Sequence, residues 1–122
     1  MARFLVHIHS GPQAANTVTL GAFIAAEAAA AGHEVTLFLA GDGVASLAPE
    51  LLPGVAGLGT GRLVDHLRDL GAAGGEICVS RLSSQARGLD GRILEGLGAP
   101  ARFAAPADLV ALAAEADTVL CY

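Results

Sequence analysis

The sequence contains no lysine and no tryptophan, and its seven basic residues are arginines scattered without a basic run. The formal net charge is −5. Proteins that bind nucleic acid concentrate lysine and arginine on one face or in one segment. The absence of such a segment argues against a nucleic-acid partner.

Long apolar runs and cysteine pairs are also missing. The longest apolar candidate, residues 18–31, contains Glu27 and falls short of the roughly 20 residues that span a bilayer. The apolar run after Met1-Ala2-Arg3 is too short for a secretory signal. The only cysteines, Cys78 and Cys121, form no CxxC motif, which indicates free thiols. We therefore expect a cytoplasmic protein without a membrane partner.

Aromatic residues make up 4% of the chain and charged residues 16%, whereas apolar residues reach 53%. The usual apolar share is about 45–50%, so the core is expected to consist of alanine, leucine and valine. The 122 residues suit one domain, 1–122. An apolar excess on so small a chain favours a buried interface between identical subunits.

Predicted strands and helices alternate along the chain, which favours an α/β fold with a mostly parallel sheet between helices. Asn16 or Thr17 is the expected cap of the first long helix, with Leu20, Phe23 and Ile24 on its buried face. Residues 48–61 read as irregular. The predicted strands are 3–9, 34–40, 76–79, 101–103 and 118–122, and the predicted helical segments are 17–31, 44–47, 62–70, 91–97 and those opening near 80 and 106.

The stretch 76–90 holds the strongest functional candidate. Ile77-Cys78-Val79 reads as a buried strand, and a helix opens near Ser80, so this stretch reaches the sheet edge where α/β proteins bind ligands. Cys78 could be a nucleophile or a sulfur carrier if Arg81, Arg87 or the helix start favours its thiolate. The alternative is a small buried side chain in a strand.

Polar residues follow Cys78. Arg87-Gly88 could bind an anion, or it could be a surface arginine before a helix-ending glycine. Ser80, Ser83 and Ser84 lie near the helix start, where serine commonly acts as a cap. A hydrolase would need one of these serines to contact a base such as His9, and the sequence has no Gly-x-Ser-x-Gly elbow.

Metal and nucleotide motifs are incomplete. His7 and His9 share one face of a strand, but no third ligand follows at a fixed spacing. Gly41-Asp42-Gly43 follows a strand without completing GxGxxG, and no GK[ST] follows a glycine loop. We expect no metal and no cofactor.

Together these segments resemble the DsrE/DsrF/TusD-like family of small sulfur-metabolism proteins. The order and spacing of the segments carry the resemblance more than any one of them. They are Ser10-Gly11-Pro12, Gly32-His33-Glu34-Val35-Thr36, Phe38-Leu39-Ala40-Gly41-Asp42-Gly43-Val44, Glu76-Ile77-Cys78-Val79, Ala86-Arg87-Gly88-Leu89, Ala105-Pro106-Ala107-Asp108-Leu109-Val110 and Glu115-Ala116-Asp117-Thr118-Val119-Leu120.

The resemblance implies a flavodoxin-like three-layer fold with a five-stranded sheet, a homotrimer or homohexamer, and a persulfide relayed between donor and acceptor proteins. In many members a cysteine lies seven residues before the arginine of the Arg-Gly pair; here that position is Ser80, and a second common cysteine position is Ser83. Two hypotheses follow: a sulfur carrier or sulfurtransferase using Cys78, or a non-catalytic module that binds a small ligand or a protein. The implied ligand-binding residues are Ser80, Ser83, Ser84, Arg87, Gly88, His9, Gly11 and Asp42.

Overall fold

The computed structural model describes residues 1–122 and contains a five-stranded sheet in the order β6-β5-β2-β1-β7. Every pair of neighbouring strands is parallel, so the predicted α/β fold is confirmed and the main sheet contains no antiparallel pair. Parallel strands need crossover connections, and helices supply them here. The strands are β1 (Arg3–Ile8), β2 (Glu34–Leu39), β5 (Glu76–Ser80), β6 (Ala101–Ala104) and β7 (Thr118–Cys121).

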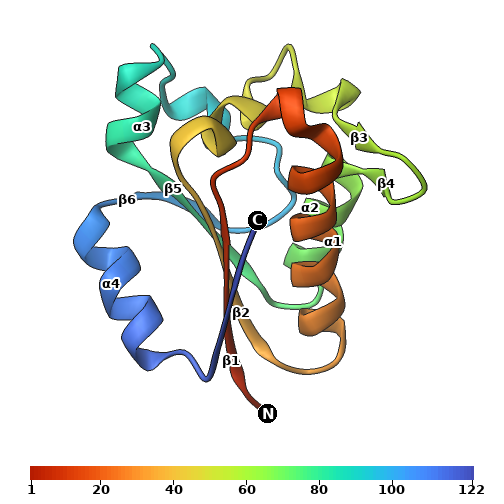
Figure 1. The fold of residues 1–122 in the computed structure, drawn as a ribbon, viewed down its shortest axis with the longest axis vertical. Coiled ribbons are helices and arrows are strands. Elements are labelled where there is room, and N and C mark those ends of the chain that lie inside the picture. Colours follow the sequence, from red (N-terminus) through yellow and green to blue (C-terminus); the bar gives the residue numbers. More distant parts are fainter.

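Helices cover both faces of the sheet, giving the three layers expected (Figure 1). Helices α1 (Ala15–Ala30) and α2 (Leu63–Ala72) lie on one side, and α3 (Arg81–Ala86) and α4 (Pro106–Glu115) lie on the other. The two faces are filled unequally. The α1/α2 face holds a core cluster of 21 buried residues, whereas the α4 face holds a cluster of 4. The second cluster consists of Leu5, Phe38, Cys78 and Ala104.

The predicted start and buried face of α1 are wrong. The helix starts at Ala15 without a side-chain cap, and the Asn16 side chain instead accepts a hydrogen bond from the Leu58 amide (2.7 Å). Leu20 is exposed, while the buried positions are mostly small. A Cβ on Gly21 would lie 2.9 Å from Ile8 Cδ1, so small residues let α1 approach the sheet closely. The buried residues of α1 are Val18, Thr19, Gly21, Ala22, Ala25, Ala26 and Ala29.

The helical turn predicted over 44–47 is present, and residues 48–61, predicted to be irregular, contain regular structure. The 3₁₀ segments η2 (Gly41–Leu47) and η3 (Leu52–Gly54) precede a small antiparallel hairpin, β3 (Ala56–Gly57) and β4 (Gly61–Arg62). The hairpin is held to α1 by the Asn16–Leu58 bond and to α2 by a hydrogen bond between His66 and the Thr60 carbonyl.

The segment predicted as a helix over residues 91–97 differs from that prediction. The helix predicted over 91–97 is a 3₁₀ turn, η4 (Gly91–Leu94), which ends before two glycines with positive φ, Gly96 and Gly98. Glycine adopts positive φ at little steric cost, so these residues favour a loop at this point.

None of the helices combines the length and the apolar content required to cross a membrane.

Candidate functional site

The carboxyl ends of β1, β2 and β5 lead into loops that meet at one edge of the sheet. Gly11, after β1, lies against Asp42, after β2: a Cβ at Gly11 would lie 2.7 Å from the Asp42 carbonyl oxygen. The Gly41 amide donates to Ser83 Oγ in α3 (2.8 Å). These contacts bring Gly11, Asp42 and Ser83 into one cluster, as the sequence pattern predicts for a sheet edge.

Arg87 joins this cluster from the end of α3. Its Nη2 lies 2.7 Å from Asp42 Oδ1, and its Nη1 donates to the Ser83 carbonyl (3.0 Å). Gly88 follows with φ +68°, which ends the helix. The Arg87 guanidinium, predicted from the sequence as a possible anion-binding group, is therefore already paired with the Asp42 carboxylate. Arg87 connects α3 to the loop after β2.

All three serine hydroxyls bond backbone groups, those of Ser80 and Ser84 at the α3 start and that of Ser83 in the loop after β2. Ser80 Oγ accepts from the Ser83 amide (3.1 Å), so Ser80 is the cap. Ser84 Oγ donates to the Ser80 carbonyl (2.7 Å), and Ser83 Oγ accepts from Gly41 as described. None of these hydroxyls is hydrogen-bonded to a histidine. The hydrolase hypothesis required such a contact and is therefore wrong.

His9 and His7 lie at the end of β1, which β2 separates from β5. His9 could serve Ser80 only if β1 and β5 were neighbours, and the strand order does not meet this condition. The two imidazole centroids lie 5.7 Å apart. Burial, and to a lesser degree the neighbouring His9, lowers the pKa of His7, whose Nε2 is buried without a hydrogen-bond partner. The chain holds no group of three or more histidine, cysteine, aspartate or glutamate side chains placed to bind a metal.

Cys78 is fully buried, at 0% exposure, beneath α4. Its neighbours in the cluster are Leu5, Phe38 and Ala104, and half-buried leucines of α4 pack against them. Burial raises the pKa of the Cys78 thiol, and the opposing effect of Arg102 is smaller. A neutral, enclosed thiol is a poor nucleophile. Cys121, by contrast, is exposed on the edge strand β7.

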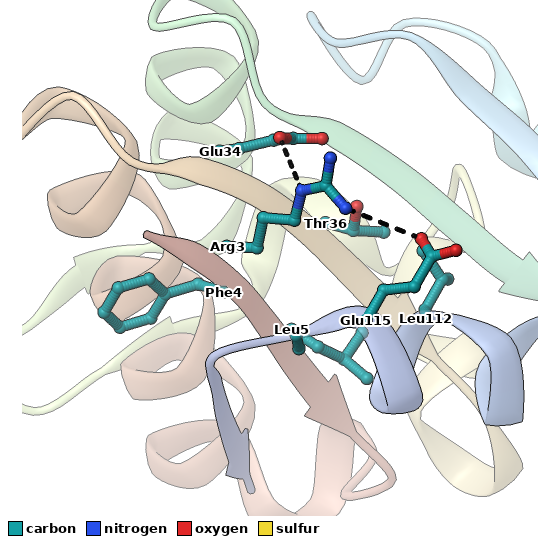
Figure 2. Close-up of a pocket in the computed structure, with 8 residues that line it drawn as sticks. Arg3, Phe4, Leu5, Glu34, Thr36, Leu112 and Glu115 are labelled. Carbon is teal, nitrogen blue, oxygen red and sulfur yellow. Dashed lines mark hydrogen bonds and ion pairs between the residues drawn. The ribbon is translucent and has the colours of Figure 1, made fainter. Parts of the chain in front are cut away.

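The structure contains three cavities, and His9, Gly11, Asp42, Cys78 and Arg87 line none of them. One cavity, of about 110 Å³, lies at the amino ends of β1 and β2 against the end of α4 (Figure 2). Arg3 crosses it, with Nε 3.2 Å from Glu34 Oε2 and Nη1 3.8 Å from Glu115 Oε2. Its charged groups are mutually paired, so this cavity offers no free group to a ligand. The smallest, about 90 Å³, lies at the amino ends of β5 and β6.

The largest cavity, about 320 Å³, lies at the carboxyl ends of β5 and β6. Among the predicted ligand-binding residues only Ser84 lines it. The sequence did not predict Gln85, Asp90 or Phe103 as site residues, and it predicted Arg81 only as a neighbour of Cys78. Phe103 reaches the cavity through the register of β6 on β5, where it pairs with Val79, and no local pattern reveals that pairing.

The fold and the sheet edge define a small α/β protein whose connecting loops form a hydrogen-bonded cluster above a buried cysteine. The chain belongs to the DsrE/DsrF-like family, whose model matches residues 2–122, so the family predicted from the sequence is confirmed. No curated protein sequence matches it. The fold is similar to that of the ychN protein from E. coli, at a TM-score of 0.78 and 18% identity over 100% of both chains. It is also similar to a conserved protein of unknown function from Bacteroides thetaiotaomicron, at a TM-score of 0.68 and 12% identity over 99% of this chain and 95% of that one.

Proposed function

We propose that this DsrE-family protein is a cytoplasmic, non-catalytic binding module and that Cys78 does not carry persulfide sulfur. The supporting observation is the complete burial of Cys78 beneath α4. A relay cysteine must reach the sulfur of another protein as a thiolate, and both exposure and thiolate character are unfavourable here. The family position for the cysteine carries Ser80, whose hydroxyl caps α3.

Mass spectrometry after incubation with a small-molecule persulfide donor tests this proposal. The Cys121→Ser variant leaves Cys78 as the only cysteine, and we expect it to gain no sulfur while folded. After unfolding in denaturant, Cys78 should react with a thiol reagent, which shows that the residue is chemically intact. Uptake of one sulfur atom by folded Cys121→Ser would refute the proposal and restore the relay hypothesis.

A cysteine introduced at the family position provides the matched control. Ser80→Cys, combined with Cys78→Ser and Cys121→Ser, places a single thiol at the end of β5, where the Ser83 amide donates to the Ser80 side chain in the native protein. That donor stabilises a thiolate. We expect this variant to take up sulfur faster than the Cys121→Ser variant, whose only thiol is Cys78, when both are incubated with the same donor. Equal, slow uptake at both positions would mean that the donor cannot reach this edge at all.

We propose in addition that the protein is a homotrimer or homohexamer assembled through α4 and β7. Helix α4 has no fully buried residue, Val110 is 69% exposed and Val119 on the edge strand is 43% exposed. The exposed positions of α4 are alanine, proline and valine, apart from Glu115. A second copy would cover this apolar surface, which water otherwise contacts at a cost of roughly 25 cal/mol per Å².

Light scattering at micromolar concentration tests the assembly. We expect a mass of three or six chains for the native protein and a smaller mass for Val110→Glu, because a carboxylate would be buried in the interface. Leu58→Glu, on the hairpin where Leu58 is 91% exposed, is the matched control and should keep the native mass. A monomeric native protein would contradict the proposal.

A further inference from the structure

The cavity at the carboxyl ends of β5 and β6 is separate from the hydrogen-bonded loop cluster around Asp42 and Arg87. It lies between α3, the loop that follows α3, and β6. Its volume of about 320 Å³ reaches the lower end of the range of small-molecule sites. The lining combines apolar surface with a few polar groups: Leu89, Phe103, Arg81, Gln85, Asp90 and the buried Ser84.

Arg81 is the group in this cavity that is free to bind a ligand. Its guanidinium carbon lies 4.8 Å from the centroid of the Phe103 ring, and this stacking holds the group over the cavity wall. The side chain makes no hydrogen bond or ion pair within the chain. It differs in this from the arginines that already bond a carboxylate or a backbone carbonyl, namely Arg3, Arg62, Arg68, Arg87 and Arg92. A planar guanidinium with free N–H groups is suited to a carboxylate, which it can bind through two parallel hydrogen bonds.

Asp90 offers a hydrogen-bond acceptor to a ligand. Its Oδ1 accepts hydrogen bonds from the Arg92 amide (3.0 Å) and Nε (3.1 Å), which lower the pKa of the Asp90 carboxyl and keep it ionised. Arg92 is paired with Oδ1, so the free acceptor on Asp90 is Oδ2. Together with Arg81, this acceptor favours a ligand with a carboxylate at one end and a hydrogen-bond donor at the other.

We propose that this cavity binds a small organic monocarboxylate, with the carboxylate on Arg81, an apolar body against Leu89 and Phe103, and a donor group toward Asp90 or Gln85. This inference rests on the proposed binding function and gives it a site. It is tested independently of sulfur uptake, because Cys78 does not line the cavity.

The probe is 4-aminobenzoate, which carries one carboxylate, a flat apolar ring and an amine donor. It would be titrated into the uniformly ¹⁵N-labelled full chain to about 10 mM, which covers the affinities expected of so small a ligand. We expect saturable shifts of the amide signals of Ser84, Gln85 and Gly91. Sodium sulfate at equal ionic strength should not produce them.

Two arginine variants decide the assignment. Arg81→Ala should weaken binding at least about tenfold, because a charge-assisted pair of hydrogen bonds is lost. Arg102→Ala is the matched control: Arg102 is an exposed arginine of β6 outside this cavity, and its loss should leave binding unchanged. The proposal is overturned by an absence of shifts with native protein, by equal shifts with sulfate, or by folded Arg81→Ala binding as tightly as the native chain. If Arg81→Ala does not fold, the native titration and its sulfate control decide alone.

Discussion

Helix α4 controls access to Cys78, so weakening the packing of α4 should expose the thiol. Leu109 and Leu112 are half-buried and pack against the cluster that encloses Cys78. Full burial of a leucine contributes about 1.5–3 kcal/mol, so two half-buried leucines together hold α4 with roughly that free energy. Because 1.4 kcal/mol is tenfold in an equilibrium constant, native Cys78 should react at least about tenfold more slowly than Cys78 of the chain unfolded in denaturant.

Replacing Leu112 with alanine tests this reasoning. Leu112→Ala removes about half of the leucine contacts that hold α4, roughly 1 kcal/mol, and should speed the labelling of Cys78 about fivefold. The rate of Cys78 in the chain unfolded in denaturant should not change. The assay is alkylation with iodoacetamide, under native conditions and in denaturant, with the two cysteines resolved by mass spectrometry of peptides.

Leu58→Ala provides the control, since Leu58 is 91% exposed on the hairpin and remote from α4. It should change neither rate. Two results would refute the reasoning. One is labelling of native Cys78 as fast as in the unfolded chain, and the other is an unchanged Cys78 rate in a Leu112→Ala protein that melts at a lower temperature.

Three further predictions concern the loop cluster and the histidines. Arg87→Ala should lower stability by at most about 1 kcal/mol, seen as a fall of a few degrees in Tm, because its ion pair with Asp42 is partly exposed; a much larger fall would make Arg87 a core structural residue. Gly11→Ala should lower the free energy of unfolding in urea by about 1–3 kcal/mol, because the new Cβ would lie 2.7 Å from the Asp42 carbonyl oxygen. Gly91→Ala is the control, because a Cβ at Gly91 would have open space around it. Burial lowers the pKa of His7 in the folded protein, so the unfolded chain binds more protons and stability should fall as the pH drops through 6.5. His7→Phe should flatten that slope, and His9→Gln should flatten it less, because His9 is the smaller cause of the lowered pKa. An unchanged slope in His7→Phe would assign it to other groups.

The sheet could be predicted from the sequence because its strands are short apolar runs, and β1, β2, β5 and β6 have glycine or proline near one end or both. The strand residues Val35–Leu39 are buried on both faces of the sheet, and their sequence is a nearly continuous apolar run, as is typical of parallel strands. The buried face of α1 could not be predicted, since its alanines differ little in hydropathy from one face to the other. The hairpin over 56–62 has strands of two residues, and side chains distant in sequence, Asn16 among them, hold it in place.

The candidate site was predictable in position and less so in composition. A strand followed by a helix start identifies the carboxyl edge, and Asp42, Ser83 and Gly11 do meet there. The pairing of Arg87 with Asp42 spans 45 residues and depends on the order of β2 and β5, which no local pattern encodes. The cavity beside Arg81 depends in the same way on the pairing of β5 with β6.

The difference between positions 78 and 80 explains why the same residue type would behave differently at each. Both side chains point to the α4 face, because a strand repeats every two residues. They lie about 6.6 Å apart along the strand. At position 78 a sulfur atom meets Phe38 and Leu5 under α4, whereas at position 80 the side chain reaches the helix start and accepts the Ser83 amide. A two-residue displacement along β5 therefore moves a thiol from a site that favours its protonated form to one that favours the thiolate, and in this protein the cysteine occupies the first site and a serine the second.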